Sequence, residues 1–522
     1  MTKARDIASK FSNADANTNY GTGSLAANTT GANNTAVGQN ALKVNTTGPW
    51  NVAIGTEALA ANTTGNGNIA IGFNALQLNT SGSSNVAIGR VSLQNNTTGV
   101  FNTGVGIGTI TDNTDGSNNV AVGYLGLRTN TTGAGNVAVG SNAMRYNTIG
   151  YNCTAVGYLA LHINTTGFDN TAIGTSAMYS NTTGIYNVAV GRQAMELNTT
   201  GGGNTALGRY SLHDNTTGYD NTAVGLNALL ANTTGYGNVA IGAYSLDASN
   251  TGYSNTAMGY NSLSATTIGS ENTAVGVQAM LNNTTGNYNV AVGAYALNSN
   301  ISGVNNVAVG MFALATSTSN SNIGIGRNAL YSCTTGFQNV AVGESTTQSI
   351  TGGYQNTAIG FQAGFSGTNN LTTGFNNTLI GYQAATSSAT VSNTITFGNA
   401  SITTLRAQVT SITALSDQRD KTAIEPLAVG LDFINGLKPV KFEWNMRDGG
   451  KVGVADAGFI AQDLVAAEDA TGLANHLQLT YRDNPDKLEA TQGRLIPVLV
   501  KAIQELSAEN KALAARLTAL EN

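Results

Sequence analysis

Charged residues are scarce in this chain: they make up only 10% of its 522 residues. The net charge is −5 and the basic residues form no cluster, which excludes the electrostatic footprint of a nucleic-acid-binding protein. The sequence also lacks an apolar run long enough for a transmembrane helix, so no membrane insertion is expected.

Targeting signals and paired cysteines are missing as well. The opening residues, MTKARDIASKF, lack the apolar core of a secretory signal, so we expect synthesis in a cytoplasm. Cys153 and Cys333 lie far apart and form no metal or redox motif, so we expect two free thiols. No metal and no cofactor are expected.

The few charges are unevenly distributed. Residues 401–522 hold 13 of the 23 Lys and Arg and 16 of the 28 Asp and Glu, so the first 400 residues are nearly uncharged. This shift predicts a domain boundary near residue 400.

A 17-residue repeat fills most of the uncharged part. The unit reads N-T-T-G-x-x-N-x-A-V-G-x-x-A-L-x-x, and its first Gly recurs every 17 residues from Gly31 to Gly303, in seventeen units without an insertion. The second Gly keeps the same step from Gly38 to Gly310, and the spacing then loosens towards Gly398. A period of this length is typical of a solenoid.

Three residues before the second Gly read as a short β-strand. Segments such as 52–54 and 290–292 alternate a β-branched residue, Ala and a larger apolar residue. The Ala position is Ala in sixteen of seventeen units, with Gly104 the exception, so we expect a close neighbour on that face. The A-L pair supplies a second inward residue, as at Leu42, Leu59, Met280 and Leu314. Stacked coils can bury both sets.

The other positions that recur from unit to unit belong to the turn and to the residue before the strand. Asn-Thr-Thr-Gly is turn chemistry, in which Asn bonds the local backbone and Gly takes positive φ. The Asn before each strand is replaced in the regular array only by Cys153, and we expect these amides to form a hydrogen-bonded ladder. Examples of these asparagines are Asn34, Asn51, Asn68 and Asn289. At about 4.8 Å per coil, some twenty coils predict a rod of roughly 100 Å over residues 21–405.

The N-x-A-V-G and A-L pattern resembles the head repeats of trimeric autotransporter adhesins. That resemblance implies a parallel β-roll or β-helix on a threefold axis, although the unit here is longer and has its own N-T-T-G turn. An interleaved triple β-helix is the alternative. The fold expected for residues 21–405 is therefore an all-β, trimeric shaft.

Residues 406–522 have the composition of an α+β domain with a helical end. Four segments, 415–421 (LSDQRDK), 434–445, 458–464 and 495–506, occur in the order found in the peptidase S74 family of intramolecular chaperones, which the region resembles. The resemblance implies a self-cleaving Ser/Lys dyad at Ser416 and Lys421, with Asp417 and Arg419 at the other matched positions.

The chemistry of the dyad fits these residue types. A Lys whose pKa is lowered by burial can take the proton of a Ser hydroxyl without help from His. The resemblance places the scissile bond next to Ser416, either at Leu415–Ser416 or at Ser416–Asp417. Single-turnover self-cleavage is expected rather than turnover of a separate substrate, and a retained, uncut domain is the alternative.

The end of the chain carries apolar residues at heptad spacing, which predicts a coiled coil over about 495–522. Asn510 occupies an a position and can specify register and chain number. The heptad residues are Ile496, Leu499, Ile503, Leu506, Leu513, Leu517 and Leu520. A trimer would give the shaft a common starting register.

These features predict a bacteriophage tail fibre or tailspike, assembled in the host cytoplasm and carried on the virion. Residues 1–20 are expected to dock on a tail or baseplate protein. A host surface glycan or protein is the expected receptor, with shaft aromatics as candidate contacts that can instead pack between protomers or over the turn: Trp50, Phe101, Tyr151, Phe168, Tyr186, Tyr219, Tyr236, Tyr253 and Tyr288. A polysaccharide-degrading tailspike is the enzymatic alternative, although the shaft acids are few and scattered.

Overall fold

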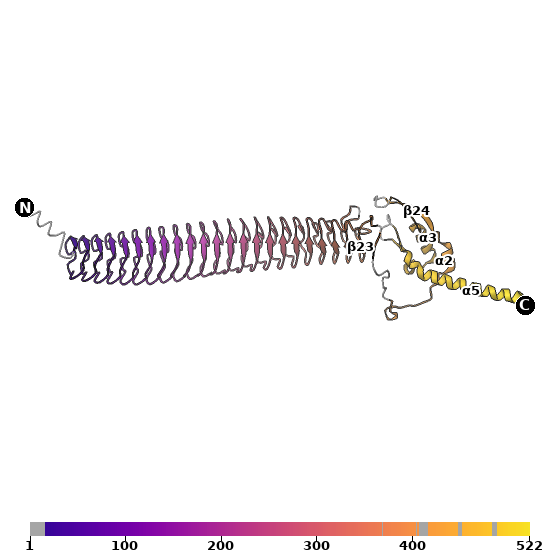
Figure 1. The fold of residues 1–522 in the computed structure, drawn as a ribbon, viewed down its shortest axis with the longest axis horizontal. Coiled ribbons are helices and arrows are strands. Elements are labelled where there is room, and N and C mark those ends of the chain that lie inside the picture. Colours follow the sequence, from indigo (N-terminus) through magenta and orange to yellow (C-terminus); the bar gives the residue numbers. More distant parts are fainter. Residues whose placement is uncertain are drawn as a thin grey trace, which may run out of the picture. The chain divides into compact units, whose positions relative to one another are not determined.

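The computed structural model describes residues 16–367, 369–402, 404–406, 416–446, 452–482 and 488–521. The chain divides into two units, residues 1–328 and residues 329–522. Within the first unit, the described residues form stacked coils, each coil being one complete turn of the chain with a single three-residue strand (Figure 1).

The strands of the first unit follow one another at the repeat spacing. They are β1 (Thr18–Tyr20), β2 (Thr35–Val37), β3 (Val52–Ile54), β4 (Ile69–Ile71), β5 (Val86–Ile88), β6 (Thr103–Val105), β7 (Val120–Val122), β8 (Val137–Val139), β9 (Thr154–Val156), β10 (Thr171–Ile173), β11 (Val188–Val190), β12 (Thr205–Leu207), β13 (Thr222–Val224), β14 (Val239–Ile241), β15 (Thr256–Met258), β16 (Thr273–Val275), β17 (Val290–Val292), β18 (Val307–Val309) and β19 (Ile323–Ile325). The first of them begins three residues before the predicted start of the shaft.

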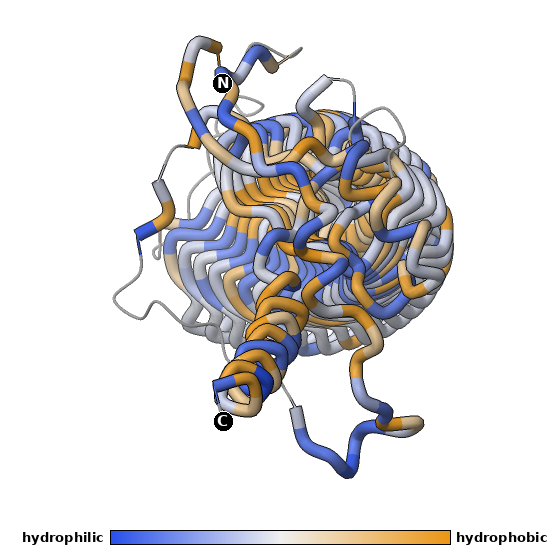
Figure 2. The backbone as a smooth tube through the Cα atoms, turned by 90° about the vertical axis from the view of Figure 1, so that its right-hand side faces the viewer, coloured by the Kyte–Doolittle hydropathy of each residue, from blue (hydrophilic) through white to orange (hydrophobic). Residues whose placement is uncertain are grey.

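Neighbouring strands are parallel, and each residue pairs with its equivalent one repeat later. Ala36 pairs with Ala53, for example, and Val37 with Ile54. Figure 2 shows that residues of like hydropathy consequently line up in rows along the stack. The predicted parallel β-solenoid with 17-residue coils is confirmed, and at about 4.8 Å per coil β1 to β19 extend over roughly 85 Å.

The interior of each coil is apolar and narrow. The middle strand residue and the Leu of the A-L pair are fully buried, as at Ala53 and Leu59. A Cβ added to Gly126, which stands at the Ala of an A-L pair, would lie 3.7 Å from Ala121 Cβ in the same coil. The close neighbour of the Ala face is therefore the chain's own coil. The close packing of the Ala face is accordingly no argument for a second protomer.

Gly104, the exception at the Ala position, compensates for polar side chains in the interior. Ser92 Oγ donates to the Gly104 carbonyl at 3.0 Å and lies 2.8 Å from Thr109 Oγ1. A Cβ at Gly104 would approach Ser92 Oγ to 2.6 Å and Thr109 Oγ1 to 2.8 Å. Because interiors are close-packed, these hydroxyls and an Ala methyl compete for the same space.

The pre-strand asparagines (Asn34, Asn51 and their equivalents) form the predicted ladder. The backbone N–H of Asn51 donates to Asn34 Oδ1 at 2.9 Å, and Asn51 Nδ2 donates to the Gly65 carbonyl at 2.9 Å. Both asparagines are buried. The ladder thus satisfies buried polar groups in every coil at which it is intact.

A second ladder, which the sequence argument missed, is formed by the turn asparagines (Asn45, Asn62 and their equivalents). Asn62 Nδ2 donates to Asn45 Oδ1 at 2.7 Å and to the Gly65 carbonyl at 3.0 Å, so the predicted local backbone bond is present together with a bond between coils. The same Gly65 carbonyl accepts from Asn51, and each N-T-T-G glycine carbonyl of this kind joins the two ladders.

Cysteines replace one asparagine in each ladder. Cys153 stands at a pre-strand position and Cys333 at a turn position, where its Sγ contacts the Gly336 carbonyl at 3.3 Å. Both side chains are buried, and neither forms a disulfide among the described residues. Burial raises the pKa of the Cys153 thiol to about 11, so it is protonated and unreactive at neutral pH.

Replacing Ser249 by Asn is expected to stabilise the shaft. Ser249 interrupts the turn ladder, and Ser249 Oγ and Asn232 Oδ1 are buried without a hydrogen-bond partner. An Asn at this position can donate to Asn232 Oδ1 and to the Gly252 carbonyl. We expect a gain of about 1–2 kcal/mol in the free energy of unfolding. Urea unfolding measures it, with Thr251→Asn, an exposed change in the same turn, as a neutral control; equal midpoints would contradict the expectation.

The turns depend on left-handed backbone conformations. Gly38 has φ of 135°, and a Cβ there would lie 2.5 Å from the Gly55 carbonyl oxygen of the next coil. Unexpectedly, the buried Leu of each A-L pair is also left-handed, with φ of 50° at Leu42. The strain of an L-residue in this region is opposed by apolar burial and by the bond from the Leu42 N–H to the Ala58 carbonyl, 3.0 Å long.

The second unit contains four more coil strands and the elements of the C-terminal region. The coil strands are β20 (Val340–Val342), β21 (Thr357–Ile359), β22 (Thr378–Ile380) and β23 (Ile395–Phe397). The C-terminal elements are η1 (Gln418–Asp420), α2 (Leu431–Gly436), β24 (Val440–Asn445), β25 (Val452–Gly458), α3 (Ala461–Thr471), α4 (Ala474–Leu477), β26 (Thr480–Tyr481), β27 (Glu489–Ala490), η2 (Gln492–Leu495) and α5 (Ile496–Glu521). The last group is the expected α+β region with a long final helix.

A small apolar core holds the C-terminal region together. Leu477, Leu479, Leu495 and Val498 are buried, and partly buried side chains such as Phe433 pack against them. Strands β24 and β25 form an antiparallel hairpin. Helix α5 buries only Val498 and Ala502, so most of its 26 residues are outside this core.

Candidate functional site

Ser416 and Lys421 are brought together by one short turn. Lys421 Nζ donates to Ser416 Oγ at 2.5 Å and also lies 3.4 Å from the Ser416 carbonyl oxygen. The 3-10 helix η1 lies between the two residues and shortens the path enough for their side chains to meet. This contact is the geometry that a Ser nucleophile and a Lys base require.

Asp417 and Arg419 stabilise that turn. The Asp417 carboxylate caps η1 by accepting from the Arg419 N–H at 2.9 Å, and Arg419 Nη2 donates to its Oδ2 at 2.5 Å. This guanidinium and N–H hold the pKa of Asp417 below its ordinary range. The carboxylate in turn raises the pKa of Arg419. Both residues are thus charged and act on the turn that presents the dyad.

The dyad is open to solvent in the single chain. Ser416, Lys421 and the residues between them are all exposed, so the burial expected around a Lys general base is absent from the single chain. Leu415, on the other side of the predicted scissile bond, lies outside the described residues. The choice between Leu415–Ser416 and Ser416–Asp417 as the scissile bond stays a prediction.

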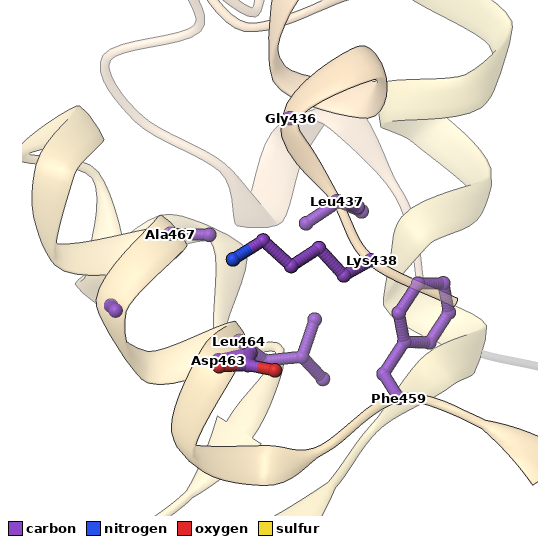
Figure 3. Close-up of a pocket in the computed structure, with 8 residues that line it drawn as sticks. Gly436, Leu437, Lys438, Phe459, Asp463, Leu464 and Ala467 are labelled. Atoms are coloured by element: carbon purple, nitrogen blue, oxygen red, sulfur yellow. The ribbon is translucent and has the colours of Figure 1, made fainter. Parts of the chain in front are cut away.

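Two of the other sequence motifs meet around a cavity of about 270 Å³. The segment 434–445 contributes Leu437 and Lys438, while the segment 458–464 contributes Phe459, Asp463 and Leu464. Figure 3 shows the Lys438 side chain extending across this cavity between Leu437 and Leu464. The motifs therefore mark packing of the connection between α2 and β24 against the start of α3.

The fourth motif contributes a carboxylate that caps a helix. Glu505 of α5 accepts from the Leu431 N–H at 2.6 Å, at the start of α2, where the preceding Gly430 has no capping side chain. Lys501 Nζ lies 3.2 Å from the same carboxylate. These two donors hold the pKa of Glu505 below its ordinary range. Lys501 and Glu505 are four residues apart on one helix, a spacing that favours an ion pair, and the sequence analysis did not use it.

A buried carboxylate outside the four motifs was also missed. Glu468 of α3 accepts from the Leu479 N–H, from Thr480 Oγ1 at 2.7 Å and from Arg482 Nη2 at 2.8 Å. Asp469 accepts from the other Arg482 terminal nitrogen at 2.8 Å. Nothing local in the sequence distinguishes Glu468 from a surface residue on α3, because its partners lie beyond the helix. This network fixes the segment that follows α4.

Among the described ranges, no group of His, Cys, Asp and Glu side chains is arranged to hold a metal ion. No helix within those ranges is both long and apolar enough to cross a membrane.

The geometry defines a protein with a long parallel β-solenoid, followed in sequence by a small α+β region that presents a Ser/Lys pair. Residues 416–473 match the family model Peptidase_S74, described as chaperone of endosialidase. The match begins at Ser416, the predicted nucleophile. Neither a curated protein nor a solved structure matches the chain. The chain has the organisation of a tail fibre or tailspike protein with a C-terminal peptidase S74 chaperone domain.

Proposed function

We propose that the chain is a bacteriophage tail fibre that attaches the virion to the host cell surface. The observation that carries the proposal is the combination of an uninterrupted solenoid shaft with the match to the S74 chaperone family. The fibre is assembled in the host cytoplasm and docks on a tail or baseplate protein through residues 1–20. Residues 1–15 of this segment lie outside the described residues.

A trimer is proposed on the basis of helix α5. Its heptad residues are exposed in the single chain, as at Ile503 with 66% and Leu513 with 55% of the residue surface accessible. Apolar a and d positions on a free helix are stabilised when helices pack against one another, and Asn510 at an a position sets register and chain number. Three parallel α5 helices would hold three S74 domains at the same position along the fibre axis.

The chaperone domain would then act on folding of the shaft. Parallel coils form contacts that are distant in sequence, so folding is slow unless the chains begin in a common register. A trimeric C-terminal domain supplies that register and can be removed afterwards by one round of self-cleavage at the Ser416–Lys421 pair. Packing of the domains around the exposed dyad is the proposed source of the burial that the single chain lacks.

We assign receptor contact to the shaft surface, where stacking of the aromatic rings limits how a glycan can bind. Tyr219 and Tyr236 stack at 4.9 Å, and Tyr236 and Tyr253 stack at 5.1 Å, so both faces of the Tyr236 ring are covered by neighbouring rings. Sugars of a host glycan can therefore reach ring edges and hydroxyls along this row. A free ring face is offered at its end by Tyr219, because the equivalent residue of the preceding coil is Gly202.

We expect the purified chain to sediment as three copies and to bind cells of the bacterium that its virion infects. Leu513→Asp places a charge in the proposed α5 seam and should reduce the trimer fraction at least about tenfold. Ala512→Asp, an exposed change off the seam of the same helix, should leave it unchanged. Sedimentation velocity and fluorescence of labelled cells measure the two properties. A monomeric wild-type chain would refute the trimer, and a trimer that leaves host cells unlabelled would refute attachment.

A further inference from the structure

The outer sheet face of the shaft, formed by the first and third residues of strands β2 to β19, is partly exposed to solvent in the single chain. The middle strand residue points into the coil, and the residues on either side of it point away from the interior. The third residue is accessible over 48% of its surface at Leu207 and 37% at Ile241. This face continues without interruption through all 18 strands.

The third positions of this face are apolar throughout, whereas eight of its 18 first positions are Thr. Its first positions are Thr, Val or Ile and its third positions are Val, Ile, Leu or Met in every one of these strands, with no charged residue. Parallel sheets are normally covered on both faces, and contiguous apolar patches of this extent mark interaction surfaces. The charged residues of the shaft, such as Asp112 and Asp214, occupy other positions of the repeat.

Flanking residues extend the apolar surface. The position after the second Gly is a half-exposed aromatic or aliphatic residue in many coils, including Phe73, Ile107, Tyr124, Tyr158 and Tyr260. The same position is Arg in four coils, at Arg90, Arg192, Arg209 and Arg327. Arginine suits the rim of a packed face, because its stem covers apolar surface while the guanidinium reaches water.

We propose that the outer sheet face is the surface through which the shafts of copies of this chain pack side by side in parallel. The inference rests on the proposed trimer and names the surface that the shaft uses in it. A partner that covers every strand of this face must have the same rise per coil over the same length. A second copy of this chain meets both conditions. The exposed heptad face of α5 independently favours parallel copies of the chain.

The size of the surface is sufficient for stable association. A standard-size interface buries about 800 Å² per partner, which 18 coils reach when each contributes roughly 45 Å². The Ala face cannot form an interface between shafts, because it is enclosed within its own coil. The outer sheet face is thus the long apolar surface that remains for contact between shafts.

The test compares two leucines ten residues apart in sequence that have similar exposure in the single chain. Leu207 lies on the outer sheet face and is 48% accessible, whereas Leu197 is 41% accessible and stands at the repeat position that holds Asp112 and Asp214 in other coils. Chains with Leu207→Cys or Leu197→Cys, expressed from the complete sequence, are labelled with a maleimide, and their masses in solution are measured by sedimentation. The native cysteines are buried and label slowly.

We expect the Leu207→Cys thiol to react at least about tenfold more slowly than the Leu197→Cys thiol, because packed interface cores exclude solvent. Ile173→Cys and Ile163→Cys repeat the comparison in case one variant fails to fold. Equal labelling rates in a chain that sediments as a trimer would overturn the assignment of this face and leave the proposed function standing. A monomeric chain would overturn both the trimer and the face.

Discussion

Purified wild-type chain is expected to appear shortened by about 107 residues, and the Ser416→Ala variant is expected to remain at full length. The shortening corresponds to release of residues after Leu415. The expectation follows from the contact between Lys421 Nζ and Ser416 Oγ, 2.5 Å long, which positions a base on the only hydroxyl that adjoins either candidate scissile bond. Intact mass and denaturing gel mobility measure the result.

The chemical step assigns one role to each residue of the pair. For cleavage at Leu415–Ser416, Ser416 Oγ attacks the Leu415 carbonyl carbon, Lys421 takes the hydroxyl proton, and the amide nitrogen leaves as a protonated amine. Water then hydrolyses the resulting ester. Lys421→Arg keeps the positive charge but provides no base, so this variant should also stay uncut.

Gln418→Ala, within the same turn, is the matched control and should be cleaved like the wild-type chain. Its side chain is not part of the Ser416–Lys421 contact. If wild type and Ser416→Ala both remain at full length, the S74 domain is a retained cap of the fibre and self-cleavage is not part of its assembly. Cleavage of the Ser416→Ala variant would assign the reaction to another nucleophile.

Gly174→Ala is expected to disrupt the shaft locally, whereas Gly126→Ala is expected to be tolerated. Gly174 has φ of 134°, and its added Cβ would lie 2.4 Å from the Gly191 carbonyl oxygen of the next coil. Backbone cannot move away there without breaking the parallel pairing, so we expect a loss of about 3 kcal/mol or more. Gly126 stands where most coils carry Ala or Ser, with ordinary contact distances for an added methyl group.

Hydrogen exchange and urea unfolding of the two variants measure the difference. Because each coil contacts only its neighbours, fast exchange should be concentrated in the coils next to position 174 in Gly174→Ala. Gly126→Ala should match wild type or be slightly more stable, since Ala restricts the unfolded chain more than Gly. Similar exchange rates and unfolding midpoints of the two variants would show that the close approach of successive coils does not determine the stability of the shaft.

Part of the candidate site could be predicted from the sequence. The spacing of Ser416 and Lys421, the neighbouring Asp417 and Arg419 and the order of the motifs indicated a local dyad, and the pair is in contact. The exposure of Lys421 could not be predicted, because burial depends on what packs against the turn. Glu468 was missed for the same reason, since its partners follow the helix that carries it.

By itself, the sequence determined the period, the strand and the turn of each coil, because these depend on residues within one 17-residue unit. The pre-strand ladder also followed from an Asn recurring at one position. Only the tertiary structure decided which neighbours the repeated residues meet: the Ala face packs in its own coil, Leu42 adopts a left-handed φ, and the turn asparagines bond from coil to coil. These contacts join residues one repeat apart or across a coil, and their geometry arises only when the coils are stacked.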